Sequence, residues 1–413
     1  MATNWAGNIT YRARGIHRPT SVPDLRALVA RSDRIRALGS RHSFTALPDS
    51  EGDLVELDGL PPEIEVDTDD RSVSVGAGCR YGEVAEHLHR AGWALANLAS
   101  LPHISVAGAV MTGTHGSGDG NTTLSASVRA LDVVGPDGDV TTLRRGDPGF
   151  DGSVVSFGVL GIVTRLVLDI EPTFDVTSTQ FTGLDWETLD AHLDEILGSA
   201  YSVSLFTRWG DRVEQAWLKS RGTSPVRELV GAEPAVETLH MLVGAPTEAV
   251  TQQLGVPGPW QDRLAHFRMA FTPSRGEELQ SEYFVARRHA RAAFAALRGL
   301  APLLAPVLQA GEIRTIAADD LWLSGAYQQD CVGLHFTWLR DEPGVYAVLP
   351  HVEAALAGLG ARPHWGKCFT LPSAELLRVY PRLADFAGLR AVRDPGRKFS
   401  NAFTDGLLSA AEA

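Results

Sequence analysis

Alternation of apolar and polar residues dominates the chain between about residues 20 and 175 and predicts a region of short strands. Four runs show this period of two: Arg71–Val75, Val128–Val134, Val140–Leu143 and Val163–Ile170. The turn residues Gly135-Pro-Asp-Gly138 join the middle two runs and predict a hairpin. Helical spacing predicts helices over Asp24–Ala30 and Tyr81–Arg90, with Gly92 as the C-terminal cap of the second.

The pattern changes near Glu171-Pro172, after which longer helical stretches alternate with strands. Helices are predicted over Trp186–Leu197 and Glu282–Leu297, and strands over Ser202–Thr207 and Leu334–Leu339. We expect Val256–Trp260 to be a loop and Pro381–Phe403 to be loop-like, because both contain turn-forming dipeptides. No internal repeat is visible.

Length and pattern together predict an α+β protein of two domains. At 413 residues the chain exceeds the usual size of a single hydrophobic core. We expect residues 1–173 and 367–413 to form a cofactor domain, to which the C-terminal tail returns. Residues 174–366 would form a substrate domain of mixed sheet and helices.

Charge and composition exclude several classes of partner. The net charge of −13 opposes binding to nucleic acid or to an anionic membrane surface. No apolar run reaches the roughly 20 residues that span a bilayer, and the N-terminus lacks the features of a signal peptide. Three widely spaced cysteines without metal-ligand spacing fit a reducing compartment. We therefore expect a cytoplasmic protein, and a monomer because no heptad pattern is present.

Two small-residue loops carry the first chemical signal. Gly39-Ser-Arg-His-Ser43 follows a short apolar run, and its backbone N–H groups can converge on an anion. Alone this segment is weak evidence, because most turns rich in glycine and serine are only turns, but a second loop, Ile104–Gly118, has the same character. Together the loops can hold both sides of an extended phosphate-containing ligand. Neither contains GxGxxG or GxxxxGK[ST], so Rossmann and P-loop binding are not supported.

A second set of polar residues lies on two predicted strands farther along the chain. Glu312 and Arg314 are two residues apart, as are His335 and Thr337, so each pair shares one face of its strand. Lys367 lies among Trp365, Cys368 and Phe369, which indicates partial burial. Such a set suits a substrate with a chain of hydroxyl groups, although a structural ion pair, a core pair and a solvated lysine remain alternative interpretations.

Several segments resemble the vanillyl-alcohol-oxidase type of flavoprotein, and within it the alditol oxidases. The matching segments are Gly39–Phe44, Ala99–Gly108, Thr112–Gly118, Glu312–Arg314, His335–Trp338 and Pro363–Phe369. The resemblance extends from Asn4 to Phe403. It implies a PCMH-type FAD-binding domain joined to a mixed-sheet substrate domain.

The resemblance implies that FAD is bonded covalently to His42 through its 8α position. It also implies a set of further cofactor-binding residues: Leu38, Gly39, Ser40, Arg41, Ser43, Phe44, Ala99, Ser100, Ser105, Gly108, Ala109, Val110, Met111, Thr112, Gly113, His115, Gly161, Ile162, His364 and Asn401. This chain departs from the family pattern at Arg41, where glycine is most common.

The implied reaction is oxidation of the terminal primary alcohol of a polyol such as xylitol or sorbitol to the aldose. Hydride passes to flavin N5, and O2 is reduced to H2O2. We expect Lys367 to accept the hydroxyl proton, Arg314 to stabilise the developing alkoxide, and Glu312, Thr337, His335 and Ser100 to bind the other hydroxyls. The small Ala99 matches the position that governs oxygen access and favours an oxidase.

Two alternative functions remain at this point. A sugar-lactone oxidase or dehydrogenase on the same fold shares the histidine loop and the segment around Lys367. A flavin-binding or metal-binding protein without turnover is a different class. The chain has thirteen histidines, but His103, His115, His335 and His364 show no ligand spacing such as HExxH.

Overall fold

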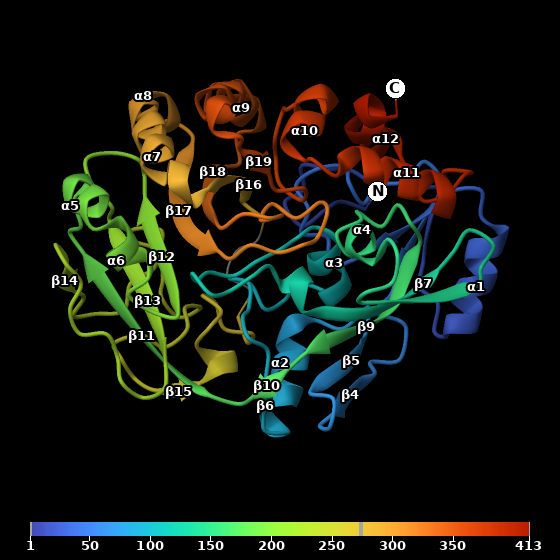
Figure 1. The fold of residues 1–413 in the computed structure, drawn as a ribbon, viewed down its shortest axis with the longest axis horizontal. Helices are drawn as coiled ribbons and strands as arrows, with labels where there is room; N and C mark the ends of the chain where they lie inside the picture. Colours follow the sequence, from blue (N-terminus) through green and yellow to red (C-terminus); the bar gives the residue numbers. More distant parts are fainter. Residues whose placement is uncertain (1, 272–275, 413) are drawn as a thin grey trace.

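The N-terminal region contains a three-stranded and a five-stranded sheet in the computed structural model, which describes residues 2–271 and 276–412, and the alternating runs all belong to the larger sheet (Figure 1). The smaller sheet is parallel, in the order β1-β3-β2: β1 (Gly15–His17), β3 (Asp53–Glu56) and β2 (Ile35–Leu38). The larger is antiparallel, in the order β4-β5-β9-β7-β8: β4 (Ile64–Asp67), β5 (Ser72–Gly76), β9 (Ile162–Asp169), β7 (Val128–Val134) and β8 (Val140–Arg144). The predicted hairpin is therefore β7–β8.

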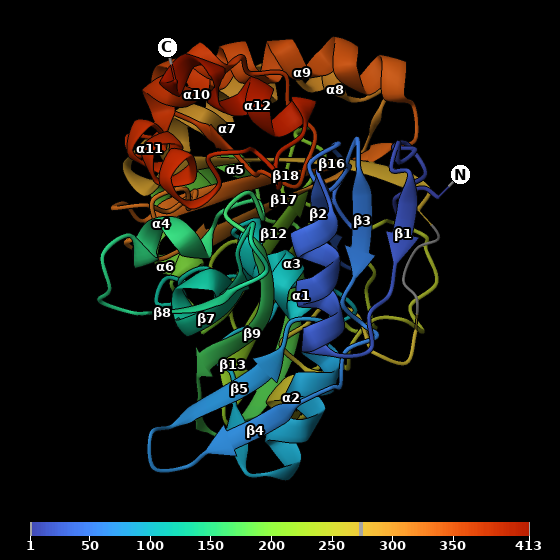
Figure 2. The ribbon, with the colours of Figure 1, turned by 90° about the vertical axis from the view of Figure 1, so that its right-hand side faces the viewer.

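Four helices accompany these sheets: α1 (Val22–Arg31), α2 (Tyr81–Arg90), α3 (Val106–Met111) and α4 (Phe150–Val154). Helix α1 begins at Ser21, whose side chain accepts a hydrogen bond from the backbone N–H of Asp24. Its apolar stripe of Leu25, Leu28 and Val29 is buried. Figure 2 shows α1 beside β2 and β3. The predicted helices over 24–30 and 81–90 are confirmed, each within two residues at its ends.

The second region is built around a nine-stranded sheet whose main path runs β14-β11-β13-β12-β17-β18-β16-β19. Its strands are β11 (Asp175–Thr182), β12 (Ser202–Thr207), β13 (Gln215–Arg221), β14 (Glu233–Pro234), β15 (Gly258–Pro259), β16 (Glu278–Ala286), β17 (Leu308–Ile316), β18 (Cys331–Leu339) and β19 (Arg362–Pro363). All of its pairings are antiparallel. A separate short pair, β6 (Trp93–Ala94) with β10 (Glu171–Pro172), lies between the regions.

One face of this sheet is apolar and packs against helices. Leu334, Phe336 and Trp338 of β18 join a core that also contains residues of five helices, α5 (Trp186–Ala191), α6 (Leu193–Leu197), α7 (Ala290–Gly299), α8 (Ala301–Leu304) and α9 (Glu342–Leu356). Because successive side chains of a strand point to opposite faces, His335 and Thr337 point to the other side of the sheet. The short helix α8 (Ala301–Leu304) follows α7.

The sequence pattern was misinterpreted at Glu282–Leu297, which is not one helix. Residues 282–286 complete strand β16, and α7 begins only at Ala290. The run Tyr283-Phe-Val285 is buried on both faces of the sheet, so it lacks the alternation that marks a half-exposed strand. The predicted helix over 186–197 exists, but it divides into α5 and α6 at His192.

The loop predicted for Pro381–Phe403 is also wrong. About half of it forms α11 (Leu383–Arg393), and α12 (Ala402–Leu408) begins just before its end. Leu383, Phe386 and Ala387 are buried at helical spacing, a signal that the turn residues Asp394-Pro395-Gly396 obscured. Helix α10 (Ser373–Val379) precedes them.

The C-terminal helices share a hydrophobic core with the N-terminal region. Leu376, Phe386 and Leu408 belong to the same buried cluster as Leu25 and Val55. Figure 1 accordingly shows the red helices α11 and α12 on the same side of the molecule as the blue α1, opposite β11 and β14. Within the two described ranges, no helix is long and apolar enough to cross a membrane.

Candidate active site

The two small-residue loops lie against each other, as their sequences suggested. The N–H of Ser105 donates to Ser40 Oγ at 3.1 Å, and the N–H of Ser40 donates to Ser105 Oγ at 3.4 Å. A Cβ atom at Gly39 or Gly108 would lie 2.7 or 2.8 Å from Ser105 Oγ. Glycine at both positions therefore permits the close approach of the loops.

His42 has a free ring nitrogen in this pair of loops. Its ring stacks on Trp5 with centroids 5.2 Å apart, and its Nδ1 atom is buried without a hydrogen-bond partner among the described residues. Burial lowers the pKa of His42 to about 4. The imidazole is therefore neutral at physiological pH, which is the form that acts as a nucleophile.

The loops form one wall of a cavity of about 860 Å³, and the polar face of the nine-stranded sheet forms another. Most residues predicted for the cofactor line this cavity: Leu38, Gly39, Ser40, Arg41, His42, Ser43, Phe44, Ala99, Ser100, Ser105, Gly108, Ala109, Met111, Thr112, His115, Gly161 and His364. All five residues predicted for catalysis do so as well: Glu312, Arg314, His335, Thr337 and Lys367.

Four predicted cofactor residues do not line the cavity. Val110 and Ile162 are fully buried in the N-terminal core. Gly113 lies next to Val155 and has a φ of 70°, a backbone conformation that favours glycine. Asn401 is engaged elsewhere, in a contact between helix α12 and residues 46–49.

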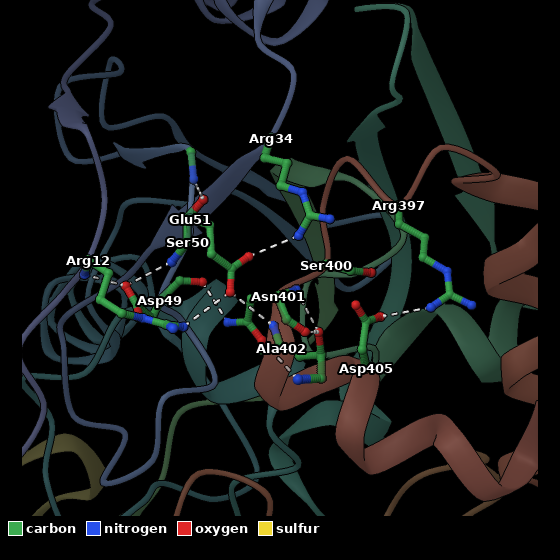
Figure 3. Close-up of polar contacts among 12 residues, drawn as sticks. Arg12, Arg34, Asp49, Ser50, Glu51, Arg397, Ser400, Asn401, Ala402 and Asp405 are labelled. Atoms are coloured by element: carbon green, nitrogen blue, oxygen red, sulfur yellow. Dashed lines mark hydrogen bonds and ion pairs between the residues drawn. The ribbon is translucent and has the colours of Figure 1, made fainter.

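The side chain of Asn401 caps a helix and also binds a distant segment of the same chain (Figure 3). Its oxygen accepts a hydrogen bond from the N–H of Thr404 at the start of α12. Its amide nitrogen donates to the carbonyls of Ala46 and Asp49, at 3.0 and 2.6 Å. All polar atoms of this side chain are thus used in holding α12 against residues 46–49.

Strand register brings the substrate-side residues into one row on the sheet. Glu312 of β17 and Glu282 of β16 both pair with His335 of β18, which lies between them. Gly333, opposite Arg314, leaves room for a carboxylate, because a Cβ there would lie 3.2 Å from Glu282 Oε1. The period of two predicted from the sequence is confirmed for both strand pairs.

Glu282, which the sequence interpretation missed, is the centre of this cluster. It is 1% exposed, and its carboxylate contacts Arg314 Nη2 at 2.8 Å, Lys367 Nζ at 2.7 Å and His115 Nε2 at 3.1 Å. Burial alone would raise its pKa, but Lys367 and Arg314 hold the pKa well below the usual range. Its alternation with Gln280 was the available signal, hidden by the helix predicted over 282–297.

Lys367 and His335 form a second polar contact within the cluster. Lys367 Nζ lies 2.7 Å from His335 Nδ1, and His335 Nε2 lies 3.2 Å from Thr337 Oγ1. Burial, with the neighbouring lysine, lowers the pKa of His335 to about 4. A neutral His335 therefore accepts from Lys367 and donates through Nε2 to Thr337. Burial also lowers the pKa of Lys367, although Glu282 opposes the shift.

Glu312 faces a histidine that the sequence interpretation also missed. Its Oε1 lies 3.0 Å from His266 Nε2, and its Oε2 lies 3.6 Å from Arg314 Nε. Burial would raise its pKa, but Arg314 and the bond from His266 hold the pKa well below the usual range. Glu312 therefore faces the cavity as an ionised hydrogen-bond acceptor.

A backbone hydrogen bond ties the two walls together. The N–H of Phe44, next to the His42 loop, donates to the carbonyl of Gly366 at 2.7 Å, one residue before Lys367. His364 Nδ1 accepts from the N–H of Gly366 at 3.1 Å, and burial holds the pKa of His364 well below its usual range. Within the described part of the chain, no group of three or more His, Cys, Asp or Glu residues is placed to hold a metal ion.

This combination defines a class of enzyme. Paired loops rich in glycine and serine, a neutral histidine with a free nitrogen and a long cavity fit FAD, because the loops offer N–H groups to a pyrophosphate and the histidine offers a nucleophile. The buried charged cluster faces the same cavity, as a substrate site beside a redox cofactor would. The site is that of a flavin-dependent oxidoreductase.

Comparisons with known proteins agree. A family model described as "FAD binding domain" matches residues 13–144, and one described as "D-arabinono-1,4-lactone oxidase" matches residues 271–407. An alditol oxidase of Streptomyces sp. (strain IKD472 / FERM P-14339) is 48% identical over 98% of each chain. An L-gulono-1,4-lactone dehydrogenase of Mycobacterium tuberculosis is 28% identical over 98% of each chain.

A crystal structure of cholesterol oxidase from B. sterolicum has the same fold, with a TM-score of 0.76 at 17% identity over 98% of this chain and 96% of that one. The chain belongs to the vanillyl-alcohol-oxidase (PCMH-type) family of FAD flavoproteins. It is an FAD-dependent oxidoreductase.

Proposed function

We propose that this protein is an alditol oxidase, which oxidises the terminal primary alcohol of an open-chain polyol to an aldose and reduces O2 to H2O2. The observation that carries the proposal is the row Glu312–His335–Glu282, with Arg314, Thr337 and Lys367 beside it, on a sheet face opposite the His42 loop. Similarity to an alditol oxidase along the whole chain supports it.

FAD is proposed to be bonded covalently to His42, with the Ser40 and Ser105 loops around its phosphates. The buried, unpartnered Nδ1 atom and the neutral state of the ring support this attachment. Bound in this cavity, the flavin supplies the acceptor for the substrate hydride and the route for electrons to O2.

The substrate chain is proposed to bind through its hydroxyl groups. Ionised Glu312 accepts a hydrogen bond from a substrate hydroxyl, while Arg314 and Thr337 offer hydrogen-bond donors on the same face of the sheet. Ser100, from the opposite wall, would complete the set. A row of alternating acceptors and donors suits the repeated –CHOH– units of a polyol and excludes bulky apolar substrates by the cost of leaving these groups unpaired.

Lys367 is proposed to take the proton of the hydroxyl that is oxidised. Its amine faces the cavity, and burial lowers its pKa, which increases the neutral fraction that can act as a base. Glu282 and His335 fix the position of the amine through 2.7 Å contacts. Arg314 stabilises the negative charge that develops on the substrate oxygen.

Ala99 is proposed to leave the path of O2 open. Its methyl group lines the cavity next to Ser100, and a larger side chain would occupy that space.

A sugar-lactone oxidase or dehydrogenase is the second candidate, favoured by the lactone-oxidase family model over residues 271–407.

A peroxide-coupled assay of xylitol, sorbitol, mannitol, glycerol and sugar lactones tests the proposal. Polyols should give turnover with one H2O2 per O2 consumed in an oxygen electrode. Preferential turnover of lactones would instead support the second candidate, and turnover only with an artificial electron acceptor would support a dehydrogenase.

Acid precipitation tests the covalent attachment. The yellow colour should stay with the precipitated polypeptide of the purified enzyme, and His42→Ala should release all of its flavin into the supernatant. Flavin released from the unmodified protein would contradict the linkage at His42 without affecting the proposed substrate.

A further inference from the structure

A buried chain of polar side chains leads from Glu312 through His266, which lines the cavity, to Lys219, which does not. Lys219 on β13 is 1% exposed, and its Nζ lies 2.6 Å from the carbonyl of Leu264, 2.9 Å from that of Ala265 and 3.1 Å from His266 Nδ1. The other ring nitrogen of His266 is the one that faces Glu312, at 3.0 Å. A lysine at this depth without a carboxylate in contact is costly and calls for a role.

The hydrogen-bond partners of Lys219 determine which tautomer His266 adopts. An ammonium group has three N–H donors, and two of its partners are carbonyls that can only accept. The third N–H therefore points at His266 Nδ1, which must accept. Burial, with the neighbouring Lys219, lowers the pKa of His266 to about 4, so the ring is neutral. Its single proton then lies on Nε2 and is donated to Glu312.

We infer that Lys219 is a positioning residue for substrate binding: it holds His266 in the Nε2–H tautomer, which fixes the carboxylate of Glu312 as an acceptor for a substrate hydroxyl. This inference rests on the proposed function. Lys219 has no direct part in the hydride and proton transfers, because of Lys219 and its three contacts only His266 lines the cavity.

The same contacts support the opposite wall of the site. The backbone N–H of His266 donates to the carbonyl of Ser100 at 3.1 Å, and the N–H of Phe267 donates to the same carbonyl at 3.2 Å. Lys219 thus anchors the segment 264–266 from the sheet side, and that segment holds Ser100. Both ends of the proposed hydroxyl-binding set depend on one buried amine.

This arrangement makes substrate binding dependent on pH. The ionisable groups that act on Lys219 are His266, on the segment packed against the sheet, and Glu312 on β17; its strand neighbours on β11 and β12 are Ser178 and Ser202. Burial lowers the pKa of Lys219 to about 7, against the effect of Glu312. A neutral amine keeps two N–H groups for the carbonyls and turns its lone pair to His266 Nδ1. The single ring proton then moves from Nε2 to Nδ1, where it is donated to the amine, so the donor to Glu312 is lost as pH rises.

Three variants of the holoenzyme test the inference by kinetics. Lys219→Met should raise the KM for the polyol about tenfold, the scale of one lost hydrogen bond to a charged group, with kcat changed less than about threefold. His266→Gln should keep a low KM, because its amide nitrogen occupies the place of Nε2 and donates regardless of Lys219. His266→Asn, which is too short to reach Glu312, should raise KM as Lys219→Met does.

The pH profile and a double variant sharpen the comparison. In the unmodified enzyme KM should rise above about pH 7, whereas Lys219→Met should show a high KM without this rise. Adding Lys219→Met to His266→Gln should raise KM by less than Lys219→Met does alone, because only the support of the segment that holds Ser100 is then lost. An unchanged KM in both Lys219→Met and His266→Asn would overturn the inference.

Nitrogen-15 spectra of the histidine rings give a readout that does not need turnover. The His266 signals, assigned by their loss in His266→Gln, should show the Nε2–H tautomer at pH 6 and lose it as Lys219 titrates. If Lys219→Met does not fold, this titration of the unmodified protein is the test of the inference. A His266 tautomer that stays constant to pH 9 would contradict it. Absence of polyol turnover would refute the proposed function alone, since the tautomer is read separately.

Discussion

Two charged neighbours of Lys367, Glu282 and Arg314, shift the pKa of its amine in opposite directions. Glu282 favours its charged form, while burial and Arg314 favour the neutral one, and the net result is a lowered pKa. Because only the neutral amine can accept a proton, the rate of flavin reduction at saturating polyol should rise with pH, with a midpoint below the ordinary lysine value of about 10.5.

Lys367→Met should slow flavin reduction in stopped flow by about 10²-fold or more and remove this rise with pH. Thr337→Val is the matched control: it removes one hydroxyl-binding group, so it should raise KM and keep the pH-dependent rise. A reduction rate that is unchanged in Lys367→Met would exclude Lys367 from the mechanism.

Arg41 occupies a backbone conformation that its residue type disfavours. Its φ is 63°, and its guanidinium forms a half-buried ion pair with Glu56. The resemblance identified this position as a departure from glycine, and the left-handed backbone explains why glycine is common there. The ion pair with Glu56 offsets part of the strain, although a pair with this exposure contributes at most about 1 kcal/mol.

Comparing Arg41→Gly with Arg41→Ala isolates the strain, because both variants lose the ion pair and only alanine keeps a Cβ. Arg41→Gly should be more stable than Arg41→Ala by about 1 kcal/mol in urea-induced unfolding at matched flavin content. Equal stabilities would show that the loop leaves the left-handed conformation when the arginine is removed.

Single residues also show where sequence interpretation stops. Glu312, Arg314, His335 and Thr337 were predicted to share strand faces because a period of two is a local property. Glu282 and His266 reach the same site from a strand whose alternation ends at Glu282 and from a long loop. Their contribution depends on strand register and loop packing, which no local pattern encodes.

Among the elements, α12 depends on Asn401 for both its start and its position. Asn401→Ala removes the cap and the donors to Ala46 and Asp49, so it should lower the free energy of unfolding by about 2–4 kcal/mol. Asn401→Ser keeps a capping oxygen but cannot reach residues 46–49, and should be less destabilising by about 1 kcal/mol. Flavin content per folded molecule should stay constant in both variants. A loss of flavin without a loss of folded protein would show that Asn401 contributes to cofactor binding.

Elements with one exposed face were the predictable ones. Helices α1 and α2 and the β7–β8 hairpin have amphipathic patterns and clear caps or turns, and the structure confirms them. Strand β16 and helix α11 were misassigned because the first is buried on both faces and the second ends in a turn-rich segment that dominated the pattern. Burial set by tertiary packing was the missing information in each case.

Across the whole molecule, Arg36 joins segments that are far apart in the chain. Its guanidinium is buried and donates to the carbonyls of Leu47 and Phe157, each at 2.7 Å, and to that of Phe399. Burial lowers its pKa to about 10, so it stays charged at physiological pH. The three carbonyls belong to the His42 side of the cavity, the central core and the C-terminal segment.

Arg36→Met should lower the free energy of unfolding by about 3 kcal/mol or more, because three buried carbonyls lose their donor. Arg36→Lys keeps the charge but cannot span all three carbonyls, so it should be intermediate. Chemical denaturation followed by circular dichroism measures both. A stability of Arg36→Met equal to that of the unmodified protein would show that other groups satisfy these carbonyls.

The shared core of α1, α2 and the C-terminal helices has a consequence for the order of events during synthesis on the ribosome. Domains generally fold as they emerge, yet the core around Leu25 and Val55 lacks the apolar surfaces of α10–α12 until residues 376–408 have been translated. The sheet formed by β11–β18 can close earlier. The hydrogen bond from Phe44 to Gly366 likewise forms only once residue 366 has emerged, so the wall that carries His42 becomes fixed late, after the substrate face already exists.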